Sequence, residues 1–237
     1  MPVYFASDMH LRLDRPDRAR RLARWVGGLN PDDALYLVGD VCDFWCASRE
    51  RPLDASTCQG LRALAGFRDR GGSLTVLTGN HDLWLGPDYE RILGATLAPE
   101  PLIVEAYGLR VSLSHGHRAG GRESWKAFME SRSFLSVFAG LPGPLAARLD
   151  RMLETRNEVG RVRDEARLVE IYRRRLAALD PSVDIAVFGH VHTPVDDPTT
   201  RPRLIIIGGW HDRTCYLRLD ENGATHVVEP AASAVPA

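Results

Sequence analysis

Aspartate, histidine and asparagine residues occur in this sequence in five short groups, each directly after an apolar run. Their side chains offer oxygen and imidazole nitrogen, a mixture that suits Mn²⁺, Fe²⁺ or Zn²⁺ better than Mg²⁺ or Ca²⁺. Such a set could support metal-assisted attack of water on a phosphoester. The groups are Asp8-x-His10, Gly39-Asp40-x-x-Asp43, Gly79-Asn80-His81-Asp82, His115-Gly116-His117 and Gly189-His190-x-His192.

The spacing within these groups predicts how the side chains converge. Residues two apart in an extended segment face the same way, which we expect for Asp8 with His10 and for His190 with His192. Each motif is weak alone, because a single histidine after a strand is more often hydrogen-bonded structure. With Asp40 shared, the set suffices for two ions about 3.5–4 Å apart. The predicted ligands are Asp8, His10, Asp40, Asn80, His115, His190 and His192.

Strands and helices alternate in the first hundred residues. This β-α-β-α-β order with continuously apolar strands is typical of a sheet covered on both faces, whose site lies at the carboxyl ends of its strands. The predicted fold class is therefore α/β. We expect strands at 2–7, 35–38, 74–77, 101–106, 109–114, 183–188, 203–207 and 214–219, and helices at 17–29 and 59–70.

A long insertion separates His115 from His190. It is predicted to be helical from about 123 to 179, with a break at 141–144 and a candidate interruption at Gly160. Residues 116–179 contain 13 Lys/Arg and 8 Asp/Glu, a net charge of +5, which leaves −6 for the rest because the total is −1. We predict one domain over residues 1–237, with a helical cap at about 118–179 and a disordered tail at 229–237.

Composition excludes several classes of protein. The four cysteines, Cys42, Cys46, Cys58 and Cys215, have no zinc-ribbon spacing, so we expect reduced thiols in a cytoplasmic protein. No apolar run reaches the roughly 18–20 residues of a membrane span, and the chain opens into a strand rather than a signal peptide. The nearly neutral net charge disfavours binding to nucleic acid.

In this order the five groups resemble those of the calcineurin-like metallophosphoesterase superfamily, and the resemblance extends over nearly the whole chain. It implies a β-sandwich of two mixed sheets flanked by helices. His81 would be the catalytic histidine, a cation or acid beside the leaving oxygen, with Asp82 orienting it. The resemblance assigns Asp8, His10, Asp40 and His192 to one ion, and Asp40, Asn80, His115 and His190 to the other.

Three further features look like the UDP-2,3-diacylglucosamine pyrophosphatases of lipid A synthesis. They are the aromatic end of the second group at Phe44-Trp45, the Gly208-Gly209-Trp210-His211 segment, and the helical cap. The resemblance implies Mn²⁺ and attack of water at the phosphate next to uridine, giving UMP and 2,3-diacylglucosamine 1-phosphate. It also implies a lipid-linked sugar nucleotide as substrate and peripheral contact with the cytoplasmic face of the inner membrane.

The chain departs from that family at three positions. His81 stands where many of these enzymes have arginine, His117 stands where they have aspartate, and Gly209 replaces the aspartate of Gly-Asp-Trp. A histidine at position 81 is nearer the pattern of the broad superfamily.

The cap suits an amphiphilic substrate. Its aromatic residues could line an acyl groove, continued by Phe134, Leu135, Phe138 and Leu141, and its arginines could meet phosphates or an anionic bilayer. Alternatively, the aromatics pack the insertion onto the core and the arginines form a solvated face. The predicted substrate contacts are Asn80, His81, Arg118, Arg122, Trp125, Phe128 and Arg156.

Other functions remain open at this stage. A generic phosphodiesterase or phosphatase acting on a soluble nucleotide or a phosphoprotein would need no apolar cap, and the insertion would then be a subunit interface. A nuclease is disfavoured because the scaffold is acidic. A non-catalytic scaffold protein is disfavoured because the ligand set is complete. The native metal and the oligomeric state are not fixed by the sequence.

Overall fold

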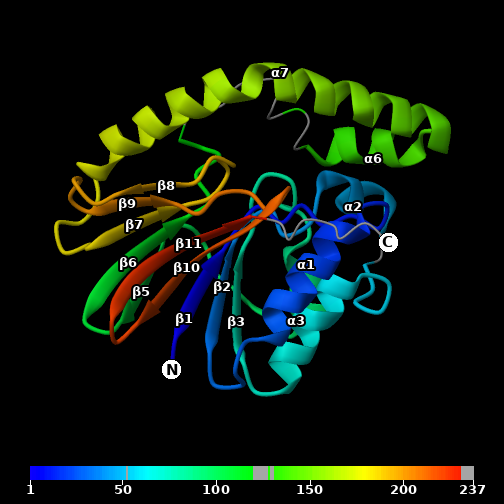
Figure 1. Cartoon of the computed structure of the whole chain (residues 1–237). Helices are drawn as coiled ribbons and strands as arrows, with labels where there is room; N and C mark the ends of the chain where they lie inside the picture. Colours follow the sequence, from blue (N-terminus) through cyan, green and yellow to red (C-terminus); the bar gives the residue numbers. More distant parts are fainter. Residues whose placement is uncertain (52, 120–127, 129–130, 231–237) are drawn as a thin grey trace.

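Two sheets pack face to face around one apolar core in the computed structural model, which describes residues 1–51, 53–119, 128 and 131–230, the side chains of 154–164 excepted (Figure 1). The first sheet has the strand order β11-β10-β1-β2-β3-β4. Its strands are β1 (Val3–Ala6), β2 (Ala34–Val38), β3 (Ser73–Leu77), β4 (Thr96–Leu97), β10 (Arg213–Asp220) and β11 (Gly223–Pro230). The second sheet has the order β5-β6-β7-β9-β8. Its strands are β5 (Leu102–Ala106), β6 (Leu109–Ser114), β7 (Ile185–Phe188), β8 (Val195–Asp197) and β9 (Arg203–Ile206).

Both sheets mix strand directions. In the first, β1 to β4 run parallel, while β10 is antiparallel to β1 and β11 to β10. In the second, β7 lies parallel between β6 and β9, with β5 and β8 antiparallel at the edges. The predicted sandwich of two mixed sheets flanked by helices is therefore confirmed.

Helices α1 (Pro16–Gly27) and α3 (Gln59–Asp69) pack together beside the first sheet (Figure 1). Pro16 suits the start of α1, because its missing N–H would have no partner in the first turn. Two other helices, α2 (Phe44–Arg49) and α4 (Gly86–Leu93), were not expected from the sequence. They have 6 and 8 residues, too few to display a helical period.

The cap contains α6 (Arg132–Gly140) and α7 (Gly143–Leu176), and α7 arches over both sheets (Figure 1). The predicted break at 141–144 is confirmed, since α6 ends before it and α7 begins within it. The predicted interruption at Gly160 is wrong, because α7 is one continuous helix of 34 residues that includes this glycine. One glycine costs a helix about 1 kcal/mol, which its many helix-forming neighbours can offset.

The end of the chain is more ordered than expected. The predicted tail included Glu229 and Pro230, but both pair with β10, opposite Thr214 and Arg213. The prediction is wrong for these two residues, and residues 231–237 lie outside the described part of the chain. Across the described residues, no helix is both long and apolar enough to cross a membrane. All four cysteines are buried free thiols, as expected.

Candidate metal centre

One group of possible ligands gathers Asp8, His10 and His192, from the loops after β1 and β7. Their ligand atoms all lie within 4.8 Å of one another. Asp8 Oδ1 is 3.8 Å from His10 Nε2 and 3.7 Å from His192 Nε2, and the two imidazole nitrogens are 3.2 Å apart. The structure therefore brings together side chains that are 182 residues apart in the sequence.

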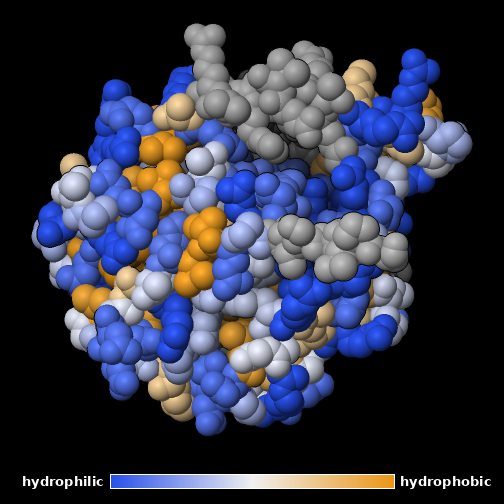
Figure 2. All heavy atoms as spheres, in the orientation of Figure 1, coloured by the Kyte–Doolittle hydropathy of each residue, from blue (hydrophilic) through white to orange (hydrophobic). Residues whose placement is uncertain are grey.

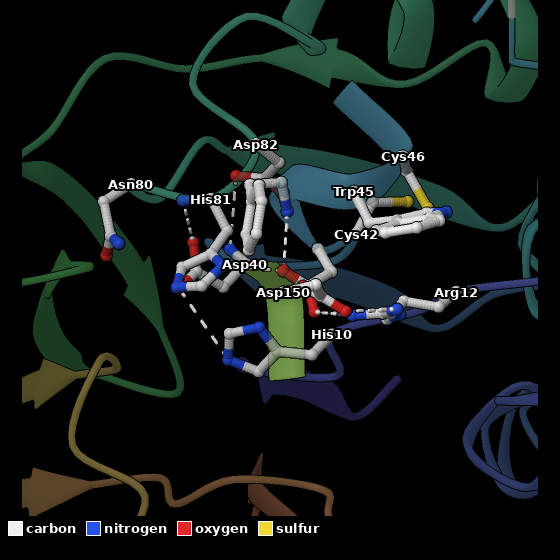
Figure 3. Close-up of polar contacts among 12 residues, drawn as sticks. His10, Arg12, Asp40, Cys42, Trp45, Cys46, Asn80, His81, Asp82 and Asp150 are labelled. Carbon is white, nitrogen blue, oxygen red and sulfur yellow. Dashed lines mark hydrogen bonds and ion pairs between the residues drawn. The ribbon is translucent and has the colours of Figure 1, made fainter. Parts of the chain in front are cut away.

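A second group contains Asp40, His115 and His190. His115 Nε2 lies 3.3 Å from Asp40 Oδ2 and 3.2 Å from Asn80 Oδ1. Asp40 Oδ2 is also 3.8 Å from His10 Nε2, so this carboxylate stands between the two groups. In Figure 3, Asn80 lies to the left of Asp40 and His10 lies below it.

Left-handed backbone conformations, rather than the alternation of side chains along a strand, orient four of the candidate ligands toward the site. Asp8, His10, Asp40 and His190 have φ values of 57°, 47°, 53° and 64°. Residues other than glycine rarely adopt this region, and clusters of such residues mark functional sites. The expectation that Asp8 and His10 share one side of an extended segment is wrong in its reasoning, because β1 ends at Ala6 and a turn directs both side chains.

Two glycines leave the space that the site requires. A Cβ on Gly79 would lie 2.1 Å from Asp40 Oδ1, and one on Gly39 would lie 2.3 Å from His115 Nδ1. Gly39 also has a φ of 84°, which favours glycine. The Gly-Asp and Gly-Asn pairs seen in the sequence are therefore needed because ligand side chains lie directly against the backbone.

Asp82 contacts the loop that carries Asp40 and makes no hydrogen bond to the His81 ring among the described contacts. Its carboxylate accepts from the backbone N–H groups of Gly79 at 2.6 Å, Asp40 at 3.3 Å and Val41 at 2.8 Å, and from the Tyr89 hydroxyl at 2.8 Å. Asp82 is fully buried. The predicted orienting role toward His81 is wrong, because both oxygens of Asp82 are already occupied by these donors.

Asp43 makes the contact that Asp82 was expected to make. Its Oδ1 lies 2.9 Å from His81 Nδ1 and also accepts the N–H of Phe44 at the start of α2. Burial lowers the pKa of His81, but the charges of Asp40 and Asp43 outweigh this effect and raise it to about 9. These two carboxylates favour the protonated form of the His81 ring, which lies 4.7 Å from that of His10.

The donor set fits a bound cation. Nδ1 of His115 lies 2.9 Å from the carbonyl oxygen of Val38, so a neutral His115 donates there and turns the Nε2 lone pair toward the oxygens of Asp40 and Asn80. These atoms need positive charge between them, either a bound cation or a proton on Nε2. Burial disfavours that proton, but the Asp40 charge outweighs burial and raises the pKa of His115 to about 10. Buried Asp8 Oδ1 likewise accepts no hydrogen bond from the described residues. Burial, with the Asp40 charge nearby, raises the pKa of Asp8 to about 7.

The predicted substrate contacts are only partly placed. Asn80 and His81 lie in the site, Arg118 is exposed just after His117, and Phe128 is exposed beside α6. Arg122 and Trp125 fall outside the described residues, and the side chain of Arg156 does too. Among the expected groove residues, Leu135 and Phe138 are buried, so they pack the cap onto the core.

Sequence reasoning left out two residues beside the site. The His211 ring lies 4.5 Å from that of His192 and 5.5 Å from that of His10. Glu165 of α7 accepts from the His192 N–H at 3.2 Å and the Thr193 hydroxyl at 2.6 Å. The position of His211 after the last core strand was a usable signal. Glu165 gave none, since a glutamate within an arginine-rich helix is usually solvated.

Comparison with known families agrees with this geometry. The family model for calcineurin-like phosphoesterases matches residues 1–194, a range that includes every predicted metal ligand.

The chain belongs to the calcineurin-like phosphoesterase family.

Curated relatives extend the match over almost the whole chain. A protein of Hahella chejuensis named UDP-2,3-diacylglucosamine hydrolase is 27% identical, over 94% of this chain and 95% of its own. One of the same name from Pseudomonas fluorescens is 30% identical, over 93% and 92%. A third, from Stenotrophomonas maltophilia, is 29% identical, over 95% and 97%. The resemblance is confirmed, and the chain is a phosphoesterase with three overlapping candidate metal-ligand groups, the third being His10, Asp40 and His81.

Proposed function

We propose that this phosphoesterase binds two divalent cations, with Mn²⁺ preferred and Fe²⁺ or Zn²⁺ as alternatives. The observation that carries the proposal is the position of Asp40 Oδ2, 3.3 Å from His115 Nε2 and 3.8 Å from His10 Nε2. One ion would take Asp8, His10, Asp40 and His192. The other would take Asp40, Asn80, His115 and His190.

We further propose that the substrate is UDP-2,3-diacylglucosamine. The enzyme would cleave its diphosphate by water attack to give UMP and 2,3-diacylglucosamine 1-phosphate. The names of three relatives that match over at least 92% of their length support this substrate. So does His81, whose protonated form is favoured by Asp40 and Asp43 and which lies close enough to the candidate ligands to meet phosphate oxygens.

When bound, the cations would acidify water and neutralise phosphoryl charge. The protein's own residues do the rest. His81 would stabilise negative charge on the leaving phosphate, and Asp43 would keep its ring aimed at the reacting group. Asn80 and Asp40 would set the distance between the phosphoryl group and His81, because the loops after β2 and β3 are joined by the hydrogen bond from the His81 N–H to Asp40 and both donate to Asp82.

The cap would bind the acyl chains. A row of aromatic contacts leads from the site to the surface: His81 to Phe44 at 5.9 Å, Phe44 to Phe138 at 5.4 Å, Phe138 to Phe134 at 6.0 Å and Phe134 to Phe128 at 5.5 Å. Phe128 is 50% exposed at the outer end, where an acyl chain could contact it. We propose residues 118–179 as this cap, with Arg118, Arg122, Trp125 and Arg156 as further contacts.

We also propose a cytoplasmic protein that touches the inner membrane peripherally. Val137, Leu145 and Met152 of the cap are 67%, 51% and 50% exposed, which gives it apolar surface for a bilayer or a lipid substrate. On the face shown in Figure 2, hydrophobic residues occur in small separate groups among hydrophilic ones. This pattern fits contact through a limited region better than broad insertion.

The alternative is a generic phosphodiesterase or phosphatase with a soluble substrate. To separate the two, purified protein with Mn²⁺ is given UDP-2,3-diacylglucosamine in ¹⁸O-labelled water, and a chromogenic phosphodiester in parallel. We expect UMP carrying one ¹⁸O atom and unlabelled diacylglucosamine 1-phosphate by mass spectrometry, with no products from Asp40→Ala. Hydrolysis of the chromogenic ester without UMP from the lipid substrate would favour the alternative.

A further inference from the structure

Arg12 is a buried cation surrounded by carboxylates just outside the candidate metal centre. Its side chain is 3% exposed. The guanidinium donates through Nε and Nη2 to the two oxygens of Asp14 at 2.8 and 2.9 Å. Its plane lies over the Trp45 ring, 4.8 Å from the centroid. Arginine is suited to this place, because its planar fork can serve several carboxylates at once.

The cap supplies a second carboxylate to Arg12. Asp150, on α7, accepts from Arg12 Nη2 at 2.9 Å although the two residues are 138 positions apart. The Asp150 side chain is only 5% exposed. Figure 3 shows Asp150 beside the guanidinium of Arg12, with Trp45 above it in this view. This contact joins the cap to the loop that also carries His10.

Asp43 connects Arg12 to the site. Its Oδ2 is 3.5 Å from Arg12 Nη1, while its Oδ1 is 2.9 Å from His81 Nδ1. One carboxylate therefore faces the buried guanidinium on one side and the histidine ring on the other. The contacts run without a gap from α7 through Arg12 and Asp43 to His81.

We propose that Arg12 and Asp150 are positioning residues, which hold Asp43 and thereby orient His81 only when α7 is docked. The proposal rests on the role suggested above for His81. It assigns the buried ion pair a function in catalysis beyond attaching the cap.

A purely structural tie would not need this arrangement. Burying charged groups costs several kcal/mol, so such pairs are often no more stabilising than apolar packing. Elsewhere α7 is tied to the core by a half-exposed pair, Arg173 with Asp197 at 3.1 Å, which lies away from His81. That pair offers a matched control for loss of an ionic contact between α7 and the core.

The test compares Asp150→Asn and Arg12→Lys with two controls, Arg173→Gln and the charge-conserving Asp150→Glu, in the full-length protein. Asp150→Asn keeps the shape but removes the charge, and Arg12→Lys keeps the charge but loses the fork. The His81 Nδ1–H resonance, assigned by its loss in His81→Gln, reports the contact with Asp43 by NMR, with and without diamagnetic Zn²⁺. We expect it to shift or broaden in the first two variants and to stay unchanged in Arg173→Gln and in Asp150→Glu.

Kinetics give the second readout. We expect kcat on the lipid substrate to fall roughly ten-fold in Asp150→Asn and Arg12→Lys, with KM changed less than about two-fold and metal content unchanged. A wild-type His81 signal in both variants, with circular dichroism showing a folded protein, overturns the proposal. So does an equal change in the Arg173→Gln control. The NMR result decides the matter even if the wild-type protein fails to turn over the lipid substrate.

Discussion

The backbone N–H of His81 donates to Oδ1 of Asp40 over 2.9 Å. The other oxygen, Asp40 Oδ2, faces the imidazoles of His10 and His115. One carboxylate thus fixes the main chain of the candidate catalytic histidine and also joins the two ligand groups. Substitutions at Asp40 and at His81 should consequently have separable effects.

Replacing Asp40 by alanine should abolish metal binding and activity together. The group with His115 and His190 loses its carboxylate, and the group with His10 and His192 keeps Asp8 but loses the shared oxygen of Asp40. Elemental analysis of protein purified in Mn²⁺ should show metal falling from two equivalents to less than one. Full metal loading in Asp40→Ala would contradict the shared role.

Replacing His81 by alanine should leave the metal in place and reduce the rate. The imidazolium is predicted to stabilise charge on the leaving group, and loss of such a group typically lowers kcat by about 10²–10⁴-fold. Steady-state kinetics with metal analysis on the same sample separates this outcome from that of Asp40→Ala. Normal kcat would remove His81 from the mechanism.

Asp82→Asn should destabilise the protein rather than affect catalysis alone. An amide nitrogen would face donors that now meet an oxygen, such as the Val41 N–H or the Tyr89 hydroxyl. We expect the free energy of unfolding to fall by about 3 kcal/mol, measured by urea denaturation. Tyr89→Phe, which removes one donor to Asp82 and the acceptor of the Cys42 N–H, should cost less, about 1–2 kcal/mol. Equal losses in the two variants would argue against this account.

Gly79→Ala should impair metal binding while the chain still folds. The new Cβ would stand 2.1 Å from Asp40 Oδ1 and displace that carboxylate. Gly140→Ala is the matched control, because nothing lies within 4 Å of its added Cβ. Isothermal titration calorimetry with Mn²⁺ should show weaker binding only in Gly79→Ala. Wild-type Mn²⁺ affinity in Gly79→Ala would mean that the loop can move aside without displacing the Asp40 carboxylate.

The four thiols should be unreactive in the native protein. All are buried, and burial raises the pKa of Cys58 and raises that of Cys215 to about 12. The thiolate is the reactive form, so Ellman's reagent at pH 8 should label fewer than one thiol per chain before unfolding and four in guanidinium. A rapid native reaction would reveal local opening near one cysteine.

The sequence was sufficient to predict which side chains lie together, because each belongs to a short motif beside a strong strand signal. Apolar runs such as Leu35–Val38 predict strands, and parallel strands bring the residues after their carboxyl ends together. The left-handed turns at Asp8 and His190 could not be predicted in this way, since their φ values depend on contacts with distant loops. The order of strands and helices thus predicted which side chains lie together, but not the left-handed turns that orient them.

Side-chain relationships across the fold were harder to predict. Asp82 and Asp43 are both acids near His81, and only the structure shows that Asp43 contacts its ring. The pairing of Arg12 with Asp150 joins residues 138 positions apart and leaves no local pattern. Helix α7 appeared in the sequence as an arginine-rich amphipathic stretch, in which one buried aspartate is indistinguishable from its solvated neighbours.

The contact between Arg12 and Asp150 bears on how this protein could be re-engineered. The insertion resembles a detachable module, because it enters and leaves the sandwich between β6 and β7. Yet it shares a buried ionic cluster with the twelfth residue of the chain. A chimera whose foreign cap lacks a carboxylate at the position of Asp150 would leave the buried guanidinium of Arg12 with only the carboxylates of Asp14 and Asp43. Cap transplants should therefore be designed together with the loop after β1.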